Sequence, residues 1–359
     1  MSDISERKES HLQLCTTEDV EHRSGTLLDE VHLLHDSLPE LSVDEVDLSC
    51  ELFGRRLEAP LLISGMTGGT PEAAKLNRGL AIVAQKCGLG MGVGSQRAML
   101  FHPEATESYR VRDVAPDILL LANLGAVQVR EVGPARTAEL VQAIGANALC
   151  VHLNAAQELV QAEGDRDFRG CLLAIQELVD TLPVPLVVKE TGCGLAPGTL
   201  ERLAAIGVRW VDVSGAGGTT WTGVEALRGP QRQRALGREL REWGIPTAAC
   251  VAYAKRAGLG TIASGGVRGG LDAARALALG ADAVALALPF LRALAQGGTA
   301  RALEVAAEIT EALRAVAVLT GSRRAADLQN VPRVLGPRLR AWLDTSGGHP
   351  EVLRRPSAR

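Results

Sequence analysis

The sequence predicts a (β/α)8 barrel that follows an N-terminal extension. Three observations support this fold: eight short apolar segments, a regular spacing, and a composition that is 46% apolar but only 3% aromatic. The first four segments begin about 29 residues apart, the length of one βαβ unit. A core of Ala, Val, Leu and Ile suits buried parallel strands covered by helices. Eight such units fit a closed barrel.

Each expected strand is a short apolar run, and most of them precede a helical pattern. The strands lie near residues 60–64, 89–93, 118–122, 148–151, 186–189, 210–213, 260–263 and 283–287. A doubly wound open sheet is the alternative. The first strand lacks a GxGxxG turn, and eight regular units favour closure. The long connection after the sixth strand contains Trp221 and Trp243, and we expect it to form a lid or an interface.

Two segments lie outside the expected barrel, which occupies residues 59–325. Residues 1–58 form a polar arm with four of the seven histidines. Residues 326–359 form a C-terminal segment, and we expect its last part to be disordered because it contains Gly, Pro and Arg residues without an apolar pattern.

Charge and cysteine usage narrow the function classes. A net charge of −4 gives no reason to expect a nucleic-acid partner. The seven cysteines are scattered and form no CxxC pair, which is typical of reduced cytosolic thiols rather than disulfides or a zinc site. No apolar run approaches the ~20 residues of a membrane span, and the first ten residues are too polar for a signal peptide. We therefore expect a soluble cytoplasmic protein.

A polar cluster follows the fourth expected strand. His152, Asn154, Gln157 and Glu158 occur within seven residues. The carboxyl ends of buried strands are where α/β proteins place their chemistry. The alternative is a strand exit that turns polar on meeting water.

Other strand exits carry residues suited to ligands, each with a plainer alternative. Ser64–Gly69 has the glycines of a backbone that approaches a flat ligand, or of an ordinary tight turn. Arg97 suits a phosphate or carboxylate, or is simply solvated. Asn123 is a ligand contact or a helix cap. Lys189 stabilises an anionic ring or acts as an acid, unless it only pairs with a neighbouring carboxylate.

Glycine-rich turns after strands six to eight predict a phosphate site. Residues 214–219 and 264–268 follow the sixth and seventh strands, and residues 286–289 end the eighth. In barrels of this kind, backbone N–H groups and a helix N-terminus hold the anion there. Before the barrel, Arg7, Lys8 and His11 form a cationic group that is either a solvated turn or part of an arm folded over an anionic substrate.

These residues resemble the type 2, FMN-dependent isopentenyl-diphosphate isomerases over residues 6 to 325. The matching motifs are Arg7-Lys8-x-x-His11, Gly65-Met66-Thr67-Gly68-Gly69, Gly94-Ser95-Gln96-Arg97, Asn123-Leu124-Gly125, His152-x-Asn154-x-x-Gln157-Glu158, Val188-Lys189-Glu190, Ser214-Gly215-Ala216-Gly217-Gly218-Thr219 and Ser264-Gly265-Gly266. Glycine-rich turns alone would fit many flavin barrels, whereas the His152 motif with Arg7-Lys8 is specific. The sequence departs at Gly65, where many relatives carry Ala, a small change beside the flavin.

The resemblance implies a role for each matching position. The implied FMN contacts are Gly65, Met66, Thr67, Ser95, Asn123, Lys189, Ser214 and Thr219, with Gly265, Gly266, Val267, Leu286 and Ala287 around the phosphate end. The implied substrate contacts are Arg7, Lys8, His11, Ser95, Arg97, His152, Asn154 and Gln157. Glu158 would hold Mg²⁺ shared with the diphosphate, because Mg²⁺ binds through few carboxylates plus substrate phosphates. Gln157, His152 and Lys189 are the catalytic candidates, and the arm covers the active site.

The implied reaction is a reversible double-bond shift between isopentenyl and dimethylallyl diphosphate without net redox change. We hypothesise that reduced FMN moves the protons near N5 through a carbocation-like state, which an anionic flavin stabilises. Lys189 would stabilise the flavin charge near N1, Gln157 would orient the alkene or relay a proton, and His152 and Asn154 would bind substrate. NADPH or another reductant would prime the flavin. The resemblance suggests a homo-oligomer, a tetramer or octamer.

Two alternatives to the isomerase compete with it: a flavin-barrel oxidoreductase and a non-catalytic flavin sensor. A 2-hydroxy acid oxidase needs a catalytic His late in the barrel, and an inosinate-dehydrogenase-like enzyme needs a Cys after the sixth strand. The turns at 264–268 and 214–219 contain neither. The second alternative is a non-catalytic flavin sensor, and a sensor has no need of a magnesium carboxylate such as Glu158.

Overall fold

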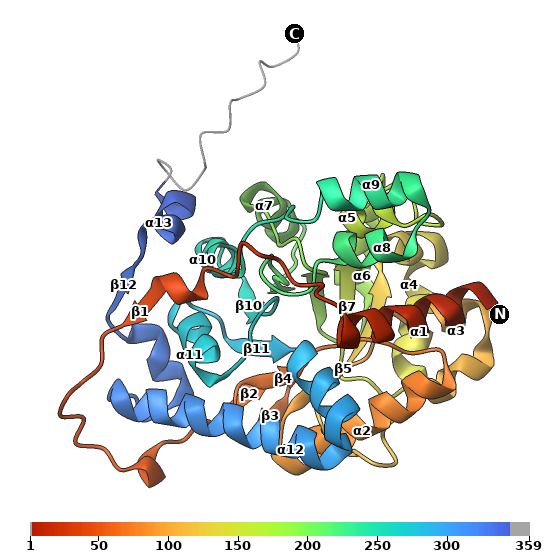
Figure 1. Cartoon of the computed structure of the whole chain (residues 1–359). Helices are drawn as coiled ribbons and strands as arrows, with labels where there is room; N and C mark the ends of the chain where they lie inside the picture. The colour runs from red at the N-terminus through yellow and green to blue at the C-terminus, as the bar shows by residue number, and fades with distance from the viewer. Residues whose placement is uncertain (1, 345–359) are drawn as a thin grey trace.

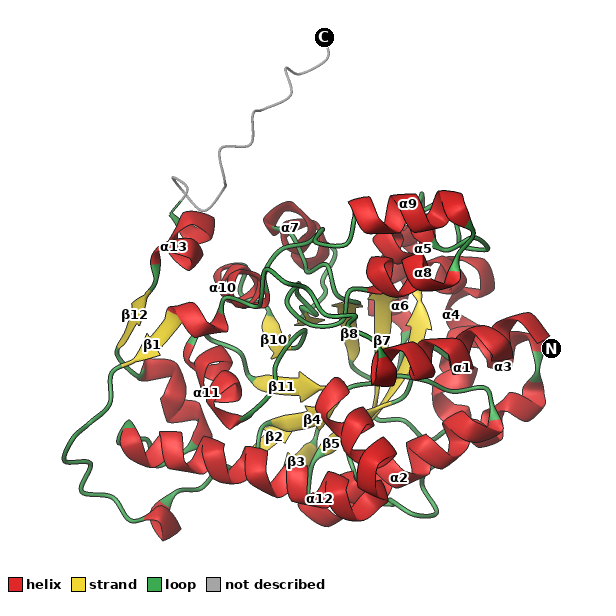
Figure 2. Cartoon of the chain, in the orientation of Figure 1, coloured by secondary structure: helices red, strands yellow, loops and turns green. Residues whose placement is uncertain are grey.

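A computed structural model describes residues 2–344, with side chains left undescribed for residues 2–7 and 9. The expected disorder of the last segment falls on residues 345–359, which lie outside the described residues. Eight parallel strands close into a barrel in the order β10-β11-β4-β5-β6-β7-β8-β9. Figure 2 shows these strands within a surround of helices. The (β/α)8 prediction is therefore confirmed, and the open sheet is excluded.

All eight predicted strands form where the apolar runs placed them. They are β4 (Leu61–Ile63), β5 (Gly90–Gly92), β6 (Leu120–Gly125), β7 (Ala148–Leu153), β8 (Leu186–Glu190), β9 (Trp210–Asp212), β10 (Gly260–Ala263) and β11 (Ala283–Leu286). The ring closes where β11 pairs with β4, with Val284 opposite Leu61 and Leu286 opposite Ile63. Parallel strands buried on both faces read as nearly continuous apolar runs, which is why the sequence located them.

Helices cover the barrel and extend its loops (Figure 1). Those outside the strands are α2 (Pro71–Cys87), α4 (Ala126–Ala143), α6 (Cys171–Thr181), α7 (Pro197–Ala205), α10 (Thr247–Arg256), α11 (Gly270–Ala278) and α12 (Leu288–Leu319). Shorter helices in the loops are α3 (Arg97–Phe101), α5 (Ala155–Val160), α8 (Trp221–Arg228) and α9 (Gln231–Glu239), with 3-10 turns at Leu28–Glu30, Val43–Glu45, Pro103–Ser108 and Ala325–Asn330. The backbone leaves helical geometry at Gly133 in α4 and at Gly297 and Gly298 in α12. None of the described helices is long and apolar enough to cross a membrane.

The N-terminal 58 residues divide between the two ends of the barrel. Helix α1 (Ser2–Thr17) lies beside α8 and α12, on the carboxyl side of the strands (Figure 1). The hairpin of β2 (Cys50–Leu52) and β3 (Arg55–Leu57) closes the opposite end, where Phe53 packs on Trp210 at a ring distance of 4.9 Å. The expectation of one arm over the active site is therefore wrong for its second half. Polarity marked the segment as lying outside the barrel without indicating which end it covers.

The C-terminal segment pairs with the N-terminal extension. Strand β12 (Arg333–Leu335) pairs antiparallel with β1 (Val31–Leu33), and α13 (Pro337–Leu343) follows it.

The glycine-rich turn that precedes α11 is held by the contact between α11 and α12. Gly270 makes that contact possible, because a Cβ there would lie 2.3 Å from the Ile309 carbonyl oxygen and 2.4 Å from the Leu313 nitrogen.

Gly270→Ala should lower the free energy of unfolding by about 1–3 kcal/mol, because the added methyl group forces two helix backbones apart. The neighbouring Gly269 is a matched control, since a Cβ there meets nothing within 4 Å. Gly269→Ala should change stability by less than about 0.5 kcal/mol. Urea unfolding followed by circular dichroism measures both, and equal losses in the two variants would contradict this packing argument.

Candidate active site

One cavity lies at the carboxyl end of the barrel, and all eight strand exits contribute to it. Its empty volume is about 1350 Å³, counted out to its open mouth. The predicted residues that line it are Lys8, His11, Gly65, Met66, Thr67, Ser95, Arg97, Asn123, His152, Asn154, Gln157, Glu158, Lys189, Ser214, Thr219, Gly265, Gly266, Val267, Leu286 and Ala287. Arg7 is the one predicted residue left over, and its side chain lies outside the described part. Closure of the barrel thus brings residues from distant parts of the chain to one place.

A buried cation sits at the floor of the cavity. The Lys189 ammonium donates to the Glu190 carbonyl oxygen at 2.5 Å and lies 3.7 Å from Asp212 Oδ2. The Ser264 hydroxyl donates to the other Asp212 oxygen. Because a buried charge is costly unless it is paired, the Asp212 carboxylate stabilises and positions the Lys189 ammonium. Sequence reasoning missed Asp212, whose only signal is an acidic residue at the end of an apolar strand.

The loop after β8 is folded around a second carboxylate. Glu190 Oε2 accepts the backbone N–H groups of Thr191 and Gly192, both at 2.7 Å, and those of Cys193 and Gly194. Burial raises the pKa of Glu190, against the effect of these N–H groups. The carboxylate therefore fixes the rim of the cavity next to Lys189, and its role is to shape the loop.

Asn123 determines the state of His152. The Asn123 amide donates to the Val93 carbonyl oxygen at 3.1 Å, so its own oxygen faces His152 Nδ1 at 2.8 Å. His152 therefore carries its proton on Nδ1, which leaves Nε2 as an acceptor. Burial, followed by the positive charges of Lys189 and Arg97, lowers the pKa of His152 to about 3. The imidazole is neutral at physiological pH.

Gln157 belongs to a second network that joins α5, α8 and α1. Its amide donates to Glu225 Oε1 at 3.2 Å, and the same carboxylate contacts His11 Nε2 at 2.8 Å and Arg228 Nη1 at 2.7 Å. Burial alone would raise the pKa of Glu225, but His11, Arg228 and Gln157 outweigh it and lower that pKa. Sequence reasoning missed Glu225, because a single Glu on a helix carries no local signal.

Glu158 is held with both oxygens oriented. Asn154 Nδ2 donates to Oε1 at 2.8 Å, and the backbone N–H of Asp165 donates to Oε2 at 2.7 Å. Within residues 2–344, no three His, Cys, Asp or Glu side chains come together as a metal cage. A divalent cation at Glu158 would therefore take its other ligands from substrate and water, the manner in which Mg²⁺ usually binds.

Two features of the cavity fit a flavin. The buried Thr67 hydroxyl has no hydrogen-bond partner among the described residues, although it lines the cavity. At the far side, Gly265 and Gly266 have φ values of +92° and +75°, and a Cβ at either would lie 2.2 or 2.3 Å from a neighbouring atom. The backbone itself therefore forms this wall, just before α11, as a phosphate-binding turn requires.

Helix α1 contributes Lys8 and His11 to the cavity lining, and the segment that follows it, residues 18–28 (the strap), lies against the glycine turns after β9 and β10. The Lys8 ammonium bonds to the Gly68 carbonyl oxygen, to Ser95 O at 3.4 Å and to the Tyr109 hydroxyl at 3.0 Å. Lys8 is thus engaged in docking α1 on the loops after β4 and β5. Sequence reasoning had assigned Lys8 to the substrate alone.

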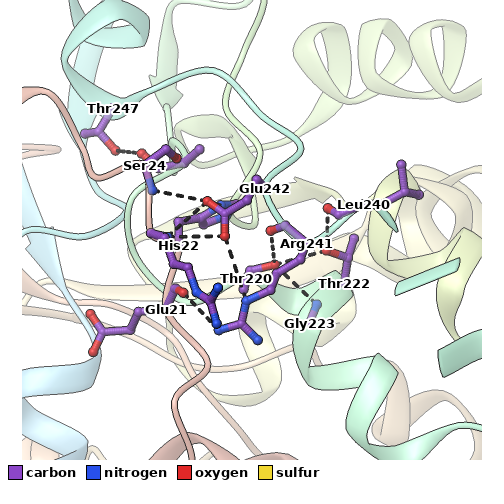
Figure 3. A network of polar contacts seen from close by, with 12 residues as sticks. Glu21, His22, Ser24, Thr220, Thr222, Gly223, Leu240, Arg241, Glu242 and Thr247 are labelled. Atoms are coloured by element: carbon purple, nitrogen blue, oxygen red, sulfur yellow. Dashed lines mark hydrogen bonds and ion pairs between the residues drawn. The ribbon is translucent and has the colours of Figure 1, made fainter. Parts of the chain in front are cut away.

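The strap is anchored to the loop after β9. His22 N–H donates to Gly218 O, and Thr220 N–H donates to Val20 O, both at 2.8 Å. Figure 3 shows Glu242 receiving the backbone N–H of Ser24, at 3.1 Å, above the Arg241 and Thr220 contacts. The long connection after the sixth strand thus holds the strap, and its role as a lid or an interface stays a prediction.

His152 should stay neutral as the pH falls to 5, because its pKa of about 3 lies below the ordinary 6.5. Between pH 6.5 and about pH 3, the unfolded chain binds more protons at this residue than the folded chain does. The free energy of unfolding therefore falls by up to about 1.4 kcal/mol for each pH unit of acidification. Nitrogen-15 NMR of histidine-labelled protein should show one Nδ1–H tautomer at pH 5 that is missing in His152→Gln. A His152 signal that titrates near pH 6.5 would contradict this state.

Comparison with known proteins identifies relatives along most of the chain. The FMN-dependent dehydrogenase family model matches residues 121–333. The isopentenyl-diphosphate delta-isomerase of Synechococcus sp. is 52% identical over 82% of this chain and 86% of its own, and that of Thermococcus onnurineus is 43% identical over 97% and 96%. That of Halobacterium salinarum is 45% identical over 94% and 96%.

Solved structures agree on the fold. A mandelate oxidase mutant with an FMN adduct superposes with a TM-score of 0.62 at 17% identity, covering 91% of this chain and 95% of its own. A mutant flavocytochrome b2 with benzoylformate gives 0.61 at 19% identity over 85% and 76%. Identities this low support the barrel fold alone. The sequence relatives go further, and with the flavin-family match they place the chain in the type 2 family of isopentenyl-diphosphate delta-isomerases.

Proposed function

We propose that this protein interconverts isopentenyl diphosphate and dimethylallyl diphosphate, using reduced FMN and Mg²⁺. The relatives named above support the reaction. The observation that carries the proposal is one cavity whose lining contains the glycine turn at Gly265 and Gly266, the oriented carboxylate of Glu158 and the neutral His152. That arrangement suits a flavin at one side and a metal-bound diphosphate at the other.

Lys189 and Thr67 are the residues proposed to hold the flavin ring. When bound in its reduced form, FMN would supply an anionic ring that can exchange a proton and stabilise positive charge on the substrate. Lys189, paired with Asp212, presents a fixed cation to that ring. The Thr67 hydroxyl offers an unused hydrogen bond at the ring edge. The turn at Gly265 and Gly266 would receive the phosphate.

The diphosphate is proposed to lie among Arg97, His11, His152 and Asn154, with Arg7 and Lys8 contributed by α1. Arginine suits this task because its planar fork binds phosphate oxygens in pairs. His152 can donate from Nε2 only after gaining a proton, so an anion placed there would raise its affinity for that proton. Glu158 would bind Mg²⁺ together with the diphosphate oxygens.

Gln157 and Glu225 are proposed to handle the proton at the alkene. The Gln157 amide is bonded to Glu225, so its orientation is fixed while it faces the cavity. The Glu225 carboxylate is ionised because its pKa is lowered by His11 and Arg228. Gln157 could take the proton released by the substrate on its amide oxygen while an Nε2 proton passes to Glu225, through the imidic acid form of the amide, and the reverse transfer would restore both residues.

The setting of the enzyme is also a proposal. NADPH or another reductant would prime the flavin and would not be consumed at each turnover. We further propose a cytoplasmic homo-oligomer, a tetramer or octamer. The oxidase and sensor readings lose support, because the sequence relatives are named as isomerases.

An anaerobic assay tests the reaction itself. The protein is supplied with isopentenyl diphosphate, FMN, Mg²⁺ and dithionite, and dimethylallyl diphosphate is measured. We expect product only when both reduced flavin and metal are present. Bound FMN without product under reduction would contradict the isomerase proposal and favour a sensor.

Gln157→Ala should lower kcat by about 100-fold or more, because the alkene loses its oriented partner and its route to Glu225. FMN content, read from flavin absorbance, should stay at the parent level. Gln85→Ala is the control, since Gln85 bonds to Asp117 on the outside of the barrel and should leave kcat unchanged. Full turnover by Gln157→Ala would remove Gln157 from this mechanism.

A further inference from the structure

Asp165 connects the carboxylate proposed for the metal with a cation proposed for the substrate. Its backbone N–H donates to Glu158 Oε2 at 2.7 Å. Its side-chain Oδ2 accepts from Gln128 Nε2 at 3.1 Å and lies 3.6 Å from Arg97 Nη1. Asp165 therefore contacts both parts of the proposed diphosphate site. Its backbone contacts the metal carboxylate, Glu158, and its side chain contacts the substrate cation, Arg97.

The loop that carries Asp165 is folded tightly onto Glu158. Arg166 bonds to the backbone oxygens of Glu158 and, at 2.6 Å, of Gln161. A Cβ at Gly164 would lie 2.1 Å from the Glu158 carbonyl oxygen, so only glycine allows this approach. These contacts fix where Asp165 stands relative to Glu158, and Gln128 fixes its side chain from α4.

The charges of this group make the entry of an anion unfavourable until a metal is present. Glu158 and Asp165 are two carboxylates beside the place proposed for a diphosphate, and Asp165 already occupies Arg97. A diphosphate must therefore compete with Asp165 for Arg97 and also meet the repulsion of both carboxylates. A divalent cation at Glu158 offsets that repulsion. Arg97 can then bind the Asp165 carboxylate and the diphosphate together.

We propose that Asp165 is a positioning residue that makes diphosphate binding conditional on Mg²⁺, because it holds Arg97 beside the metal carboxylate. The inference rests on the proposed function, since it takes Glu158 as the metal ligand and Arg97 as a substrate contact. It adds a residue to that site and assigns it a coupling role. Coupling of this kind is measurable, since each ligand must change the affinity of the other by the same factor.

The test is an equilibrium titration of the FMN-loaded enzyme with inorganic diphosphate, with and without Mg²⁺, by calorimetry. The quantity of interest is the ratio of the two Kd values, and comparing variants cancels the binding of Mg²⁺ to diphosphate in solution. Asp165→Asn should tighten metal-free binding and lower the ratio by about tenfold. Asp165→Glu keeps the charge and should keep most of the ratio.

The matched control is Asp167→Asn on the same loop, where Asp167 pairs with the exposed Arg169 at 2.7 Å and, among the described residues, bonds to neither Glu158 nor Arg97. It should leave the ratio unchanged. An unchanged ratio in Asp165→Asn, or an equal shift in Asp167→Asn, would overturn the role of Asp165 while the isomerase proposal stands. A parent enzyme that binds no diphosphate in either condition would contradict both.

Discussion

The closing strand pair is the constraint on which the rest of the molecule depends. Where β11 meets β4, the Ser64 N–H, one residue beyond the end of β4, donates to the carbonyl oxygen of Leu286, the last residue of β11, at 2.9 Å. Since all eight strands are parallel, this closure sends every carboxyl end to one rim. Residues drawn from positions between 8 and 288 can then line one cavity, although their motifs lie far apart in the sequence.

Polar groups around the cavity are satisfied mainly by one another, which fixes their orientation before any ligand binds. Asp212 pairs with Lys189, four N–H groups surround Glu190, and Asn123 sets the proton of His152. Preorganised dipoles and charges of this kind cost no rearrangement during a reaction. The exception is the Thr67 hydroxyl, which lacks a partner among the described residues and marks where a ligand's polar edge belongs.

The strands and most of the site could be predicted because buried parallel strands are continuous apolar runs and their exits are short. Asp212, Glu225 and Asp165 could not. Ser264, which bonds to Asp212, lies 52 residues away, and His11, which bonds to Glu225, lies 214 residues away, so no local pattern indicates these contacts. The same limit applies to the second half of the N-terminal arm, which closes the opposite end of the barrel. At Gly65, where the sequence alone indicated only a small departure from relatives that carry Ala, a Cβ would lie 2.1 Å from the Val93 carbonyl oxygen.

The central claim is that the chemistry at this rim moves protons without net transfer of electrons. The most direct measurement follows the flavin absorbance of the anaerobic, reduced enzyme in deuterated water while isopentenyl diphosphate is turned over many times. We expect a flavin spectrum that stays reduced, with solvent deuterium appearing in dimethylallyl diphosphate. Reoxidation of the flavin in proportion to product, or product without deuterium, would contradict it.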